Sequence, residues 1–125
     1  MSKEEILKQL DSLDINRENI TILSSGALTI RGILTSARDI DIAITKDEFD
    51  KINKKYKLLH LSDNWYRLNS KIEFMVDGFT GKREKVGKYY LHEINDYYEY
   101  IKSNLNEKNK KRIPLVEKYL KSKLI

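Results

Sequence analysis

The sequence has 125 residues, of which 40% are hydrophobic and 34% are charged, and its formal net charge is +5. This length suits one domain spanning residues 1–125, and the lack of cysteine excludes disulfide frameworks, thiolate metal sites and cysteine nucleophiles. Because no apolar run approaches the roughly 20 residues that cross a bilayer, and residues 1–11 do not resemble a signal peptide, we expect a cytoplasmic protein with no membrane partner.

The N-terminal third predicts a helix, a strand, a short helix and a second strand. Apolar residues at helical spacing favour an amphipathic helix from a capping box at Ser2 to about Asp14. The β-branched run Ile20–Leu23 predicts a buried strand, and a small polar turn separates it from a short helix over residues 27–33. Acidic and apolar residues alternate from residue 39, so residues 39–44 predict the second strand.

The middle of the sequence predicts one helix followed by several strands. A capping box at Thr45 and Glu48 begins an amphipathic helix that ends at Tyr56. The ranges that predict strands are 56–61, 65–68, 71–76 and 89–91. The polar range 81–87 predicts a flexible segment before the last of these strands.

The C-terminal third predicts two helices. Apolar residues between Ile94 and Leu105 recur at helical spacing and mark the first of them. The basic run from Lys108 to Arg112 is interpreted as a connection, and Pro114 marks the start of the second helix. Helices and strands in this order indicate an α/β or α+β domain with helices packed on a central sheet.

The predicted turn after the first strand consists of the small residues Ser24, Ser25 and Gly26. Glycine allows the backbone to approach a ligand closely, and the N–H groups at the start of the following helix would point at an anion such as a phosphate. A serine hydroxyl adds one further hydrogen-bond donor. Many strand-to-helix turns have this composition for purely structural reasons, so the turn alone is weak evidence of a binding site.

Three acidic residues in the predicted strands suggest a metal site. Asp39 and Asp41 are two residues apart in a strand, so both side chains project to one face. Two close carboxylates repel each other unless a cation or a shared proton lies between them, and hard oxygen ligands suit Mg²⁺ or Mn²⁺. Glu73 lies in the middle of a later strand and is a candidate third ligand. The alternative is that these residues lie on solvent-exposed polar strand faces.

Other residues carry weaker signals. Arg38 precedes the acidic pair and could contact a phosphate or screen the repulsion between the carboxylates. The basic run from Lys108 to Arg112 could hold a polyanion, but a solvated helix connection is the more common explanation of such a run, so a nucleic-acid partner is only weakly supported. His60 and His92 are isolated and have no metal-ligand spacing, which favours surface or structural roles.

The segment Ile22–Ile44 resembles the nucleotidyltransferase superfamily that includes polymerase beta and the minimal nucleotidyltransferases. Members carry a hydrophobic residue, Gly, then Gly or Ser, and after a short helix Asp-x-Asp, with a third acidic residue on a later strand. Ser25 and Gly26 match the small pair of this pattern. Asp39 and Asp41 match the paired metal ligands, and Glu73 matches the third carboxylate.

This resemblance implies a mixed β-sheet flanked by helices, with C-terminal helices and a site at one edge. It also implies Mg²⁺ (or Mn²⁺), and transfer of an NMP group from an NTP to a hydroxyl of a protein, small molecule or RNA. The residues expected to cradle the phosphates are Ser24, Ser25, Gly26 and Arg38. Ser25 stands where glycine is usual and Glu73 where Asp is commoner. The alternative is therefore a catalytically weak or inactive interaction protein on the same fold, antitoxin-like or phage-encoded.

Overall fold

The computed structural model describes residues 1–124, so Ile125, the last residue of the predicted domain 1–125, lies outside the described residues. Within that range the α-helices are α1 (Lys3–Asp11), α2 (Ser24–Ile30), α3 (Lys46–Tyr56), α4 (Ile94–Ser103) and α5 (Glu107–Ser122). The strands are β1 (Ile20–Leu23), β2 (Ile40–Ile44), β3 (Leu59–Ser62), β4 (Trp65–Arg67), β5 (Ile72–Val76), β6 (Arg83–Val86) and β7 (Tyr89–His92). None of these helices is long and apolar enough to cross a membrane.

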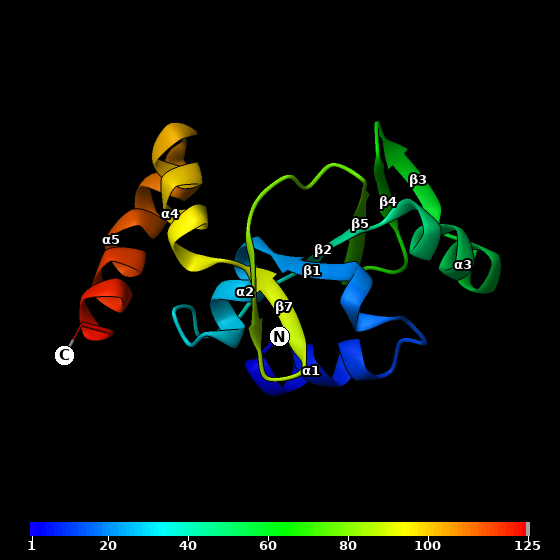
Figure 1. Cartoon of the computed structure of the whole chain (residues 1–125), viewed down its shortest axis with the longest axis horizontal. Coiled ribbons are helices and arrows are strands. Elements are labelled where there is room, and N and C mark those ends of the chain that lie inside the picture. Colours follow the sequence, from blue (N-terminus) through cyan, green and yellow to red (C-terminus); the bar gives the residue numbers. More distant parts are fainter. Residues whose placement is uncertain (125) are drawn as a thin grey trace.

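The strands form one mixed sheet in the order β3-β4-β5-β2-β1-β7-β6. β2 pairs antiparallel with β1 and parallel with β5, while β1 also pairs parallel with β7. This arrangement confirms the predicted mixed sheet with flanking and C-terminal helices. Because β5 and β6 are separated by three strands, residues 77–82 must cross the sheet, and Figure 1 shows this segment arching over it. The helices α4 and α5 pack beside each other at one end of the molecule.

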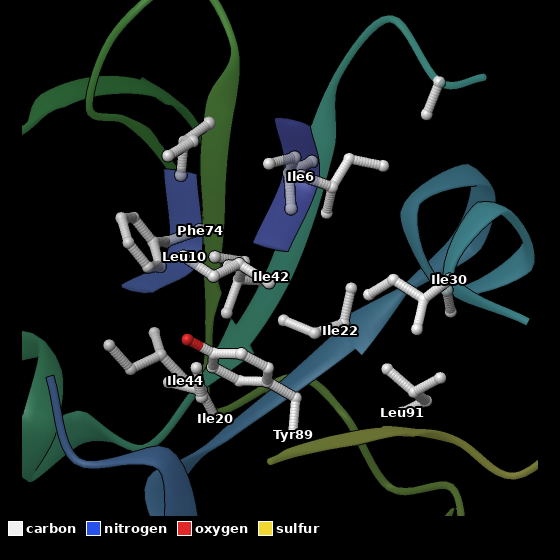
Figure 2. Packing of buried hydrophobic residues seen from close by; sticks show 14 of the residues in the cluster. Ile6, Leu10, Ile20, Ile22, Ile30, Ile42, Ile44, Phe74, Tyr89 and Leu91 are labelled. Carbon is white, nitrogen blue, oxygen red and sulfur yellow. The ribbon is translucent and has the colours of Figure 1, made fainter. Parts of the chain in front are cut away.

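The main hydrophobic core lies on one face of the sheet. Alternate residues of the four central strands meet there, among them Ile22, Ile42, Phe74 and Leu91, and each is at most 1% exposed. Figure 2 shows these side chains gathered beneath α1, which contributes Ile6 and Leu10. Since successive strand residues point to opposite faces, the residues between these positions point to the other face of the sheet.

A second, smaller core joins the C-terminal helices to the sheet. Leu28 of α2 packs there with Ile94, Tyr97 and Ile101 of α4 and with Val116 of α5. All five side chains are less than 10% exposed. This cluster therefore determines how α4 and α5 dock beside β1 and α2.

Residues 81–87 are not simply a flexible segment, as their polarity had suggested. Arg83–Val86 form the edge strand β6, which pairs antiparallel with β7. The connection is the two-residue turn Gly87-Lys88, and Gly87 has a φ of 63°, which glycine adopts without strain. Gly87 in a two-residue loop between two strands is the sequence signal that predicts this hairpin.

The interpretation of the basic run from Lys108 to Arg112 as a connection is wrong. Asn106 caps α5 by accepting a hydrogen bond from the N–H of Asn109, so the helix begins well before Pro114 and continues through it. Lys108 and Arg112 are four residues apart on this helix and therefore share one face.

Two boundaries near the predicted site also differ. α2 begins at Ser24 rather than at residue 27, because Ser24 has a φ of 51° and bends the chain from strand to helix within one residue. β2 begins at Ile40, so Asp39 lies immediately before the strand.

The predicted capping box at Thr45 is only half formed. The Thr45 side chain accepts from the N–H of Glu48, but the Glu48 carboxylate binds elsewhere. It accepts hydrogen bonds from the backbone N–H of Asn16 at 3.0 Å and from the Asn19 side chain at 3.1 Å. Burial by itself would raise the Glu48 pKa, but these hydrogen bonds and the charge of Lys51 outweigh it and hold the pKa below its usual value.

Glu48→Gln is expected to lower the free energy of unfolding by about 1–3 kcal/mol, because a charged acceptor is replaced by a neutral one at a nearly buried position. A lowered pKa means that this stabilisation is present above the usual pKa and is lost as pH falls through the folded value. Denaturant titrations should therefore show a constant difference from wild type between about pH 8 and 5 that shrinks below about pH 4.5. Glu4→Gln, an exposed position on α1, should show no such difference.

Candidate active site

Two of the predicted acidic ligands are neighbours across the sheet. Asp41 of β2 is paired in register with Glu73 of β5, and both lie on the face opposite the main core. Glu73 also forms an ion pair with Arg67 of β4, whose Nη2 lies 3.5 Å from Oε2. Asp39 is half-buried and pairs with the exposed Arg38, with 3.6 Å between Nε and Oδ2.

Asp41 is surrounded by both acidic and basic groups. Burial raises the pKa of Asp41, and the negative charges of Glu73 and Asp39 raise it further. Lys108 and Arg112 of α5 act in the opposite direction. Asp41 therefore lies near two cations of α5, a proximity that the sequence alone did not predict.

The carboxylate oxygens of Asp39, Asp41 and Glu73 are chemically suited to a divalent cation, but the three side chains do not form a tight cluster. Among residues 1–124, no group of three or more His, Asp or Glu side chains is close enough to hold a metal ion. Nevertheless Asp41 is a partly buried carboxylate that is destabilised by Glu73 and Asp39. A cation held between such oxygen ligands would offset their repulsion, and Mg²⁺ commonly uses one or two carboxylates together with substrate phosphates.

A cavity of about 690 Å³ opens on this face of the sheet. Asp41 and the turn residue Ser24 line it on the sheet side, and Phe79 of the crossing segment covers another side. Tyr97 of α4 and Lys108 of α5 complete the wall formed by the C-terminal helices. The cavity therefore lies between the sheet and the two-helix unit seen in Figure 1.

The three residues of the predicted phosphate-binding turn differ in position. Ser24 lines the cavity and holds the left-handed backbone conformation, where glycine is favoured. The backbone oxygen of Ser25 accepts a hydrogen bond from the Thr29 hydroxyl within α2. Gly26 is buried, and a Cβ atom there would lie 3.4 Å from Ile22. Ser24 thus has the backbone conformation that glycine favours and lines the cavity, whereas Gly26 is buried beside Ile22 of the sheet.

Comparison with known proteins supports the assignment of the fold. No protein-family model and no curated protein matches the chain. The solved structure of ANT(2")-Ia, an aminoglycoside nucleotidyltransferase, in complex with adenylyl-2"-tobramycin is similar, with a TM-score of 0.58 and 12% sequence identity. The match covers 94% of this chain and 86% of that chain. The chain has a nucleotidyltransferase-like fold. The predicted resemblance is thereby confirmed at the level of the fold.

The cavity also contains residues that sequence reasoning did not assign to it. His92, expected to be a surface or structural residue, is 8% exposed and lines the cavity. Its Nε2 lies 2.7 Å from Oδ2 of Asp96, and its ring packs edge-to-face on Phe79 and Tyr97. No local pattern marks these residues, because they come from a strand, a helix and a crossing segment.

Proposed function

We propose that this protein transfers a nucleoside monophosphate from an NTP to a hydroxyl group. The observation that carries the proposal is the pairing of Asp41 with Glu73 beside the cavity, with Lys108 on the opposite wall. The strand carboxylate of Asp41 and the ammonium group of Lys108 suit a metal-bound triphosphate. The likeness to an aminoglycoside nucleotidyltransferase supports the same reaction class.

In this reaction the acceptor oxygen attacks the α-phosphorus of the NTP. The bond between the α-phosphorus and the bridging oxygen breaks, pyrophosphate leaves, and the acceptor proton passes to a base. Asp39, Asp41 and Glu73 would hold Mg²⁺ or Mn²⁺, which when bound supplies neutralisation of phosphate charge and activation of the hydroxyl. Glu73, which is paired in register with Asp41, would orient or deprotonate the acceptor hydroxyl.

The cavity volume of about 690 Å³ falls within the range of pockets that bind small molecules, roughly 300–1,000 Å³. It favours an acceptor whose hydroxyl enters the cavity from a small molecule or from a protruding side chain or nucleotide. ANT(2")-Ia is solved with an adenylylated aminoglycoside, so aminoglycosides are a suitable first acceptor panel.

The test is label transfer from each of the four NTPs, carrying ³²P at the α- or the γ-position, in the presence of Mg²⁺. We expect label from the α-position on an acceptor and label from the γ-position only in pyrophosphate. Acceptors should include an aminoglycoside panel, the host proteome and total RNA. No transfer from any NTP, together with a stoichiometric and metal-independent protein partner, would contradict the enzymatic proposal and favour the interaction protein.

A further inference from the structure

Arg112 reaches from α5 back to the turn that follows β1. Its Nη1 donates hydrogen bonds to the Ser24 hydroxyl and to the Tyr97 hydroxyl, each at 3.2 Å. Ser24 and Arg112 are 88 residues apart in the sequence, so this contact joins the C-terminal helix to the sheet. Both hydroxyl residues line the cavity, which places the guanidinium at its wall.

Lys108 lies on the same face of α5, one helical turn before Arg112. It lines the cavity itself. The positive charges of both residues partly oppose the rise of the Asp41 pKa, because both residues lie near that carboxylate. α5 therefore contributes one cation that lines the cavity, Lys108, and a second, Arg112, that is hydrogen-bonded to two lining residues.

The backbone conformation of Ser24 indicates a role for its hydroxyl group. Its φ of 51° lies in the left-handed region, which is strained for a residue with a Cβ atom and unstrained for glycine. Glycine would relieve this strain, but it would remove the hydroxyl that accepts from Arg112. A serine at this position is thus unfavourable for the backbone and favourable for holding the guanidinium.

We propose that Ser24 and Tyr97 are positioning residues that hold Arg112, with Lys108, as the phosphate-binding cations of the cavity. The bound triphosphate then bridges α5 and the carboxylate face of the sheet. This inference rests on the proposed function, because it assigns the residues that bind the triphosphate of the NTP. A guanidinium fixed by two hydroxyls suits a phosphate group, since Arg presents several N–H donors in a rigid fork.

The test uses the full chain and measures binding of inorganic tripolyphosphate with Mg²⁺ by calorimetry, which avoids any dependence on base preference. Arg112→Gln is expected to weaken binding by about tenfold or more, as the loss of a charge-assisted contact requires. Ser24→Gly, which relieves the left-handed backbone strain and removes the hydroxyl, is expected to weaken binding about three- to tenfold while leaving the melting temperature equal or higher. The double variant should bind no more weakly than Arg112→Gln, because the two residues act through one contact.

Lys110→Gln is the matched control, since it removes the same charge from an exposed position on the same helix. It should change the affinity by less than about twofold at moderate salt. Equal losses in Lys110→Gln and Arg112→Gln, or wild-type affinity in Ser24→Gly, would overturn the inference while leaving the proposed function intact. If wild type binds neither tripolyphosphate nor any of the four Mg²⁺–NTPs, the proposed function fails and the inference fails with it.

Discussion

Asp41→Asn is expected to lower the rate of nucleotidyl transfer by about a thousandfold or more. Asp41 is the predicted metal ligand that lines the cavity, and it is paired in register with Glu73. An amide of the same shape keeps the packing but removes the charge that a divalent cation requires. The loss of several kcal/mol of charge stabilisation in the transition state corresponds to a rate decrease of about this size. The measurement is the rate of α-label transfer at saturating Mg²⁺ and NTP.

The same substitution is expected to raise the melting temperature of the metal-free protein. Burial and the charges of Glu73 and Asp39 raise the Asp41 pKa, so the ionised carboxylate destabilises the fold at neutral pH. The destabilisation is present above the folded pKa and is relieved as pH falls towards the ordinary value. The difference in melting temperature between variant and wild type should therefore shrink on acidification. Added Mg²⁺ should raise the melting temperature of wild type more than that of the variant.

Asp63→Asn is the matched control for both measurements. Asp63 is exposed in the turn between β3 and β4, with a φ of 47°, a conformation that asparagine tolerates well. We expect wild-type activity and an unchanged response to Mg²⁺. Full activity in Asp41→Asn, or equal losses in both variants, would show that Asp41 does not hold the reacting complex.

Phe74→Ala is expected to lower the free energy of unfolding by about 3–5 kcal/mol. Phe74 lies in the interior strand β5, is 1% exposed and packs in the main core seen in Figure 2. Truncation removes buried apolar surface and leaves a cavity that the surrounding strands cannot fully close. The measurement is a denaturant titration followed by circular dichroism.

Leu59→Ala removes a large apolar side chain from the edge strand β3, where Leu59 is 61% exposed. Its effect should stay within about 0.5 kcal/mol, because an exposed residue buries little surface on folding. A similar loss of stability in both variants would contradict the assignment of the main core to the face of β5 that carries Phe74.

The sequence by itself determined the features that depend on local spacing. Alternation around Asp41 places acidic and apolar residues on opposite faces of β2, because strand side chains alternate whatever the neighbouring strand is. The capping box of Ser2 and Glu5 is confirmed for the same reason, since both of its hydrogen bonds lie within three residues. The fold class followed from the order of such elements and from the resemblance of Ile22–Ile44.

Only the tertiary structure decided which distant residues surround Asp41. The register that sets Glu73 beside it is fixed by pairing of β2 with β5, which local patterns do not specify. Arg112 reaches Ser24 because burial of Val116 against α2 and α4 docks α5 beside the turn. Hydrophobic burial favours this docking without any directional signal in the sequence, so only the placement of α5 brings Lys108 to the cavity and Arg112 to Ser24.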